Sequence, residues 1–200
     1  MALAPVVPVV VLDDAEAAVP LAAALVAGGL PAIEVTLRTP AALEAIRRIA
    51  GEVPGAVVGA GTVVRAEDAE LSLKAGARFL VSPGCTPALR AAMAGTGLPF
   101  LPGVSSASEA MALLEQGVAE MKFFPAEAAG GAPFLKALGG PLPQVRFCPT
   151  GGVTPGNAAS YLALPNVGCV GGTWLTPKDA VAAGDWKRVE ELARQAASLG

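Results

Sequence analysis

The chain has 200 residues, a formal net charge of −3 and no histidine; 53% of it is hydrophobic and 16% is charged. This length permits one sizeable core, and we expect a single domain over residues 1–200. The low charge and a first basic residue at Arg38 argue against nucleic-acid or anionic-membrane partners and against a secretory signal. Without histidine, Ser-His-Asp catalysis, Cys-His catalysis and nearly all the usual zinc sites are excluded.

The low share of charged residues indicates an oligomer, and the cysteines indicate the cellular compartment. Because so little charge is left for the surface, we expect another subunit to cover some apolar surface. The three cysteines, Cys85, Cys148 and Cys169, show no CxxC spacing, and we interpret them as small core residues in a reducing cytoplasm. A long uncharged run near the start of the chain, 17–33, contains two prolines and two glycines, which indicates a core helix and a turn and not a membrane span.

Short apolar runs alternate with helical stretches along the chain. Helices are predicted from residues 13, 39, 66, 86, 106, 132, 154 and 176, with the last helical stretch at 186–198. The eight predicted strands lie at 6–12, 32–37, 57–62, 79–82, 100–101, 121–124, 145–148 and 167–170. Alternation of this kind predicts an α/β fold: a single-domain (β/α)₈ TIM barrel with a closed, parallel, eight-stranded sheet. An open doubly wound sheet is the second choice, because no GxGxxG turn follows the first strand.

Strand alternation places charged side chains inside this barrel. In the second strand the apolar side chains should face the helices, so that Glu34 and Arg38 point inward. From this strand alone, a structural ion pair and a functional pair are equally good interpretations. Thr62 ends the third strand as a third polar group, with a turn hydroxyl as the alternative. All three lie at or near the carboxyl ends of strands, where such barrels hold their active sites.

The sixth strand carries a lysine in an apolar segment. The same alternation turns Lys122 and Phe124 inward, and the other four lysines fall on helices or their ends. A buried ammonium is costly, so such a lysine releases its proton or finds a partner. Since a neutral amine attacks carbonyl carbon, Lys122 is a candidate Schiff-base lysine. The alternative is a surface lysine at a strand end.

Glycine pairs follow the seventh and eighth strands. Glycine lets backbone N–H groups approach an anion, and barrels frequently hold a phosphate with the loops after these two strands. The alternative is that these glycines only permit tight turns, and the pair Gly130-Gly131 could extend the site. The predicted phosphate-binding residues are Gly151, Gly152, Gly171, Gly172 and Thr173.

Six motifs together resemble a known family. In order they are Glu34-Val-Thr-Leu-Arg-Thr, Val58-Gly-Ala-Gly-Thr62, Ser82-Pro-Gly, Lys122-Phe-Phe-Pro-Ala-Glu-Ala, Arg146-Phe-Cys-Pro-Thr-Gly-Gly and Gly171-Gly-Thr-Trp-Leu. Over nearly the whole chain they resemble the 2-keto-3-deoxy-6-phosphogluconate (KDPG) aldolases, which often also act on 2-keto-4-hydroxyglutarate (KHG). The resemblance implies a homotrimeric class I aldolase on a (β/α)₈ barrel, acting on a small phosphorylated 2-keto acid without a metal or organic cofactor.

The resemblance also implies roles for single residues. Lys122 matches the iminium-forming lysine, and Glu34 matches the general acid–base. The implied substrate contacts are Arg38 and Thr62 at the carboxylate end, Pro83 and Phe124 in the pyruvyl pocket, Thr150 beside the substrate, and Gly151, Gly152, Gly171, Gly172 and Thr173 at the phosphate.

The expected reaction is reversible cleavage of KDPG to pyruvate and D-glyceraldehyde 3-phosphate. Cleavage of KHG to pyruvate and glyoxylate is a further possibility that the residues leave open. Two alternatives come from other classes. One is another phosphate-binding barrel enzyme, either an isomerase or a metal-dependent lyase, and the other is a barrel that binds phospho-sugars without catalysis.

Overall fold

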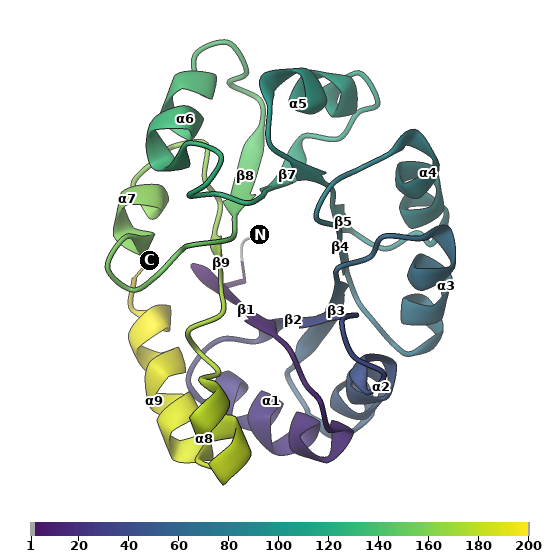
Figure 1. Cartoon of the computed structure of the whole chain (residues 1–200), viewed down its shortest axis with the longest axis vertical. Helices are drawn as coiled ribbons and strands as arrows, with labels where there is room; N and C mark the ends of the chain where they lie inside the picture. Colours follow the sequence, from purple (N-terminus) through teal and green to yellow (C-terminus); the bar gives the residue numbers. More distant parts are fainter. Residues whose placement is uncertain (1–2, 200) are drawn as a thin grey trace.

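The computed structural model describes residues 3–199, so the ends of the predicted domain, residues 1, 2 and 200, lie outside the described residues. Its strands surround a common centre, and its helices lie outside them (Figure 1). The described strands are β1 (Val6–Val10), β2 (Ala32–Thr36), β3 (Val57–Gly61), β4 (Leu80–Val81), β5 (Phe100–Leu101), β6 (Gly103–Val104), β7 (Glu120–Phe123), β8 (Arg146–Pro149) and β9 (Val170–Gly172).

The helices follow the strands along the chain. They are α1 (Ala18–Ala27), α2 (Ala42–Glu52), α3 (Ala66–Lys74), α4 (Pro87–Gly95), α5 (Ala107–Leu114), α6 (Gly131–Leu138), α7 (Ala158–Leu162), α8 (Lys178–Ala183) and α9 (Trp186–Ala197), with a 3₁₀ turn η1 (Ala15–Ala17) before α1. Most of the long uncharged run is α1, and no helix within residues 3–199 is long and apolar enough to cross a membrane.

The strands form two parallel sheets within the described chain and not one closed sheet. Their orders are β5-β4-β3-β2-β1-β9 and β6-β7-β8. The prediction of a closed eight-stranded barrel is therefore wrong, and β6 is a strand that the sequence did not predict. The first break lies at Pro102, between β5 and β6, because proline has no N–H to donate to a ladder.

The second break lies between β8 and β9. Only isolated bridges join this region, Phe147 with Val167 and Thr150 with Gly171. The sequence separation of the partners differs by one residue between the two bridges, so a regular parallel ladder cannot run through both. The strands therefore surround the centre, but their hydrogen bonding is interrupted on both sides of the three-stranded sheet.

The predicted helix start is confirmed at Thr86 and is wrong at Thr39. Thr86 caps α4 as predicted, since its side chain accepts a hydrogen bond from the N–H of Leu89 and proline follows it. The start predicted at Thr39 is wrong, because α2 begins at Ala42. The Thr39 hydroxyl instead donates to the carbonyl of Leu12, and this bond ties the connection after β2 to the connection after β1.

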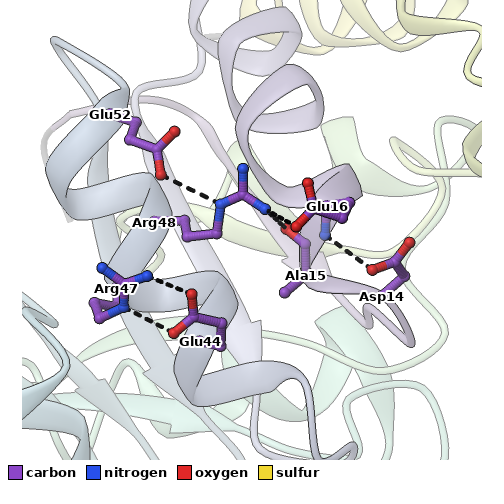
Figure 2. A network of polar contacts seen from close by, with 7 residues as sticks. All are labelled: Asp14, Ala15, Glu16, Glu44, Arg47, Arg48 and Glu52. Carbon is purple, nitrogen blue, oxygen red and sulfur yellow. Dashed lines mark hydrogen bonds and ion pairs between the residues drawn. The ribbon is translucent and has the colours of Figure 1, made fainter.

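A network of ion pairs and hydrogen bonds lies on the outside of the fold, where the connection after β1 meets α2. Arg48 of α2 pairs with Glu16 at 2.6 Å and with Glu52 at 3.2 Å, and it donates to the carbonyl of Ala15 at 3.3 Å (Figure 2). Arg47 and Glu44 form a separate pair on the same helix. The network therefore holds the turn after β1 against α2.

Candidate active site

A lysine and a glutamate meet inside the ring of strands. Lys122 of β7 and Glu34 of β2 are 88 residues apart in sequence, and Lys122 Nζ donates to Glu34 Oε1 at 3.1 Å. Their side chains are only 5% and 4% exposed. This hydrogen bond joins the two sheets. Both residues are ones that strand alternation predicted to point inward. Removing either partner would leave the other charge buried without compensation.

The position of Glu34 depends on its strand and on a neighbouring glycine. Ile33 and Val35 are fully buried in the apolar core, so Glu34 between them points the other way. A Cβ added at Gly61 of β3 would lie 2.1 Å from Glu34 Oε1. Only glycine at this position leaves room for the carboxylate to lie across β3 and reach Lys122.

Arg38 and Thr62 lie together at the carboxyl ends of β2 and β3. Arg38 Nε donates to Thr62 Oγ1 at 3.0 Å. Thr62 has φ 57°, and it is the one non-glycine residue of the described chain with positive φ. A β-branched residue rarely adopts this conformation, so the backbone here is strained. The Arg38 side chain is exposed and forms no ion pair within residues 3–199, so its guanidinium is available to an anionic ligand.

Phe124 and Thr150 lie near the end of the strand that carries Lys122. The Phe124 ring centroid lies 5.4 Å from Lys122 Nζ, and Phe124 also packs against Gly151. Thr150 is buried, and its N–H donates to the carbonyl of Phe123 at 2.9 Å. Both residues therefore lie at the end of β7 and β8 where Lys122 lies.

Pro83 follows β4 and is half-buried. A Cβ added at Gly103 would lie 2.2 Å from the carbonyl carbon of Pro83. The loop after β4 therefore rests directly on β6, the strand that pairs with the Lys122 strand.

The Gly151-Gly152 turn is held by its carbonyl groups. The carbonyls of Thr150 and Gly151 accept hydrogen bonds from the N–H groups of Ala126, at 2.8 Å, and Glu127, at 3.0 Å. In a trans peptide the N–H points opposite to the C=O, so the N–H groups of Gly151 and Gly152 point away from the Ala126-Glu127 segment. Within the described chain no hydrogen bond from the Gly152 N–H is found, while the Gly151 N–H faces β9 at the bridge between Thr150 and Gly171. A free backbone N–H in a glycine turn is suited to an anion.

The other glycine pairs differ in what they can offer. Gly171 is bridged to Thr150, which brings β9 beside the Gly151-Gly152 turn, and Thr173 after it is exposed. The N–H groups of Gly130 and Gly131 donate to the carbonyls of Glu127 and Ala126. The pair Gly130-Gly131 therefore does not extend the anion site through its N–H groups, contrary to the expectation from sequence.

No group of three or more His, Cys, Asp or Glu side chains in residues 3–199 could hold a metal ion. The polar groups that the structure brings to this end include the ion pair, the exposed guanidinium and the backbone N–H groups. A buried amine beside a carboxylate can form and break covalent bonds to a carbonyl compound, with proton transfer between the two side chains.

Comparison with known proteins matches this arrangement. A family model described as KDPG and KHG aldolase matches residues 1–192. The chain belongs to this family. The KDPG aldolase relatives include a 2-dehydro-3-deoxy-phosphogluconate aldolase of Pseudoalteromonas atlantica, 55% identical over 192 residues that cover 96% of this chain and 89% of the relative. A KHG/KDPG aldolase of Escherichia coli strain K12 is also 55% identical, over 193 residues that cover 96% of this chain and 90% of the relative.

Solved structures of KDPG aldolases share the fold. A KDPG aldolase of Legionella pneumophila, with pyruvate captured as a covalent carbinolamine intermediate, matches with a TM-score of 0.95 and 47% identity, covering 98% of this chain and 95% of that one. A KDPG aldolase of Zymomonas mobilis with 3-phosphoglycerate matches with a TM-score of 0.93 and 49% identity, covering 100% and 93%. The resemblance seen in the sequence motifs is confirmed.

Sequence reasoning missed three side chains around this candidate site. Cys148 is the register partner of Lys122 and is buried. Hydrogen bonding with Cys169 lowers the pKa of its thiol against the opposing effect of burial, and the charge of Lys122 adds to the lowering. Glu127 accepts a hydrogen bond from Tyr161 beside the glycine turn. The phase of β8 could have placed Cys148 next to Lys122, but no sequence pattern connects Tyr161 with the site.

Proposed function

We propose that this chain is a class I aldolase that cleaves KDPG reversibly to pyruvate and D-glyceraldehyde 3-phosphate through an imine on Lys122. The observation that carries the proposal is the buried Lys122–Glu34 pair, with 3.1 Å between Nζ and Oε1. The names of the Pseudoalteromonas and Zymomonas relatives, both 2-dehydro-3-deoxy-phosphogluconate aldolases, support the substrate. This pair and the family favour the aldolase over the isomerase, the metal-dependent lyase and the non-catalytic barrel.

The first step converts the ion pair into a nucleophile and an acid. A proton passes from Lys122 Nζ to the Glu34 carboxylate, which leaves a neutral amine and a carboxylic acid in a dry site. The amine attacks the C2 ketone of the substrate to give a carbinolamine. Glu34 then returns its proton to the C2 hydroxyl, which leaves as water, and the imine nitrogen carries the positive charge.

The second step breaks the carbon–carbon bond. The Glu34 carboxylate takes the proton of the C4 hydroxyl, the C4 oxygen forms the aldehyde carbonyl, and the C3–C4 bonding electrons move into the iminium. D-Glyceraldehyde 3-phosphate leaves, and Glu34 returns the proton to C3 of the enamine. Water then hydrolyses the pyruvyl imine and restores Lys122. Proton transfer by a positioned side chain typically contributes about 10²–10⁴-fold to such a rate.

The remaining residues hold the two ends of the substrate. We assign Arg38 and Thr62 to the substrate carboxylate, because the Arg38 guanidinium is exposed and unpaired within residues 3–199. We assign Pro83, Phe124 and Thr150 to the pyruvyl side. The proposed phosphate ligands are the N–H groups of Gly151 and Gly152 with Gly171, Gly172 and Thr173.

Borohydride trapping tests the central assignment. Reduction in the presence of pyruvate should add one reduced pyruvyl group to Lys122, located by peptide mass spectrometry, and should abolish activity. Lys122→Met should take up none, while the control Lys74→Met should behave as wild type, since Lys74 is an exposed lysine on α3 paired with Glu70. An adduct that persists in Lys122→Met, or active enzyme with Lys122 unmodified, would contradict the proposal.

We propose cleavage of KHG to pyruvate and glyoxylate as a second activity. The observation that favours it is that the Escherichia coli relative is named for both substrates, as a KHG/KDPG aldolase. The two substrates share the 2-keto acid end, so both can use the Lys122–Glu34 pair. Comparing kcat/KM for KDPG and KHG tests this directly, and no pyruvate release from KHG would refute it.

We also propose that the enzyme is a cytoplasmic homotrimer. Three apolar side chains near α3, Val64, Leu71 and Leu73, are at least 40% exposed, which supports their burial against another copy. All three cysteines are free thiols, which suits a reducing compartment. Light scattering of the purified enzyme tests the trimer, and a monomer at assay concentration would refute it.

A further inference from the structure

A buried tyrosine holds a glutamate against the glycine turn. Tyr161 of α7 is fully buried, and its hydroxyl donates to Glu127 Oε1 from 34 residues away. The Glu127 side chain lies flat on the turn, since a Cβ added at Gly152 would be 2.6 Å from Glu127 Cγ. The contact joins α7 to the loop between β7 and α6, which lie on the same side of the fold (Figure 1).

The same glutamate also holds the turn through its backbone. The Glu127 N–H donates to the carbonyl of Gly151 at 3.0 Å, and this carbonyl belongs to the peptide whose N–H is that of Gly152. The direction of the Gly152 N–H therefore follows from where Glu127 lies. The Gly152 carbonyl is held independently by Asn157 Nδ2 at 3.1 Å.

The hydroxyl of Tyr161 is a dependable donor. Burial, followed by the hydrogen bond to Glu127, raises the pKa of Tyr161 well above its ordinary value, so the phenol keeps its proton throughout the working range of an enzyme. Its bond to a carboxylate is charge-assisted and belongs to the stronger class of hydrogen bonds.

We propose that Glu127 and Tyr161 are positioning residues that hold the Gly151-Gly152 turn in the shape that receives the substrate phosphate. The inference deepens the proposed function and rests on it. Gly151 and Gly152 have φ of 98° and 80°, and glycine has the widest choice of backbone conformations, so the turn needs outside support to keep its two N–H groups aligned. The pair does not touch Lys122, so the covalent chemistry does not depend on it.

The test compares two acceptors in the condensation direction. Pyruvate is joined to D-glyceraldehyde 3-phosphate or to unphosphorylated D-glyceraldehyde, and the ratio of the two kcat/KM values measures use of the phosphate. Losing a hydrogen bond to a charged group is expected to lower this ratio about 5- to 30-fold in Tyr161→Phe, mainly through KM for the phosphorylated acceptor. The pyruvate concentration for half-maximal borohydride trapping should stay at the wild-type value.

Matched variants separate positioning from folding. Glu127→Gln keeps an oxygen that accepts from Tyr161 and should retain the ratio, while Glu127→Ala should lower it as Tyr161→Phe does. Glu127 is exposed, so Glu127→Ala leaves no cavity and keeps the test valid if Tyr161→Phe folds poorly. The control Ser72→Ala removes a buried hydroxyl that donates to Asp68 on α3, and it should leave the ratio unchanged.

Three results would overturn the inference. The first is an unchanged ratio in both Tyr161→Phe and Glu127→Ala. The second is equal loss with both acceptors, which is the signature of a purely structural role. The third is a wild-type enzyme that forms no imine with pyruvate, which would refute the proposed function as well. If the wild-type enzyme traps pyruvate and both variants keep the wild-type ratio of the two kcat/KM values, only the positioning role is refuted.

Discussion

Gly61→Ala should disable the proposed catalytic pair, Lys122 and Glu34, without removing either of its members. The added Cβ would lie 2.1 Å from Glu34 Oε1, whereas carbon and oxygen need more than 3.0 Å, so the carboxylate must move by about 1 Å. A displacement of this size near reacting groups can cost about 10²-fold in rate. We therefore expect kcat for KDPG cleavage to fall by about two orders of magnitude while the chain still folds.

Gly59→Ala is the matched control for this substitution. Gly59 lies two residues earlier on β3, and a Cβ there would lie 2.4 Å from the ring of Phe79 and not close to Glu34. This variant should lose stability through overpacking, by about 1–3 kcal/mol, but keep its activity per folded molecule.

The assay has two parts. Pyruvate release is followed with lactate dehydrogenase, and the folded fraction of each variant is followed by circular dichroism during urea unfolding. Wild-type kcat in Gly61→Ala would refute the reasoning. So would equal loss of activity per folded molecule in both variants, because the defect would then follow strand packing and not the position of Glu34.

Two further predictions concern buried charges. Lys122→Met should abolish cleavage and also destabilise the fold by about 3–5 kcal/mol, because Glu34 would stay buried without its partner; urea unfolding that matches wild type would contradict this. Burial would raise the pKa of Asp68, but hydrogen bonds led by the one from Arg65 outweigh it and hold that pKa below its ordinary value of 3.8. Asp68 thus adds stability above about pH 4, and this stability disappears as the pH falls through the pKa of Asp68 in the folded state. The melting temperature of Asp68→Asn should therefore fall less on acidification than that of the wild-type protein.

The sequence predicted the strands better than their closure into a barrel. Apolar β-branched runs located eight of the strands to within a few residues, because a strand buried on both faces leaves a local pattern. Closure depends on hydrogen bonds between strands that are distant in sequence. The two bridges between the β8 and β9 regions differ in register by one residue, and no local sequence pattern predicts this difference. The strand predicted at 100–101 stops before Pro102, and the pairing of Gly103 with Lys122 beyond it depends on tertiary contacts.

The candidate site could be predicted where it follows from strand alternation. Glu34 and Lys122 each interrupt an apolar alternation, and the structure brings them within hydrogen-bonding distance. The positive φ of Thr62 could not be predicted, because a threonine is chosen there for its hydroxyl toward Arg38 against its backbone preference. Tyr161 could not be predicted either, since it reaches the site from a helix through a contact that no motif contains.

The two anionic ends of the proposed substrate would be held by groups of different kinds, and this difference can be measured. Arg38 offers a full charge on an exposed side chain, whereas the Gly151-Gly152 turn offers uncharged N–H groups held by Glu127. Arg38→Met should therefore raise the pyruvate concentration for half-maximal trapping by about tenfold, the loss expected for one charge-assisted hydrogen bond. It should leave the ratio of kcat/KM for phosphorylated and unphosphorylated acceptors unchanged, which is the reverse of the effect expected for Tyr161→Phe. If Arg38→Met lowered the acceptor ratio instead, Arg38 would belong to the phosphate end, and the assignment of the two ends would be wrong.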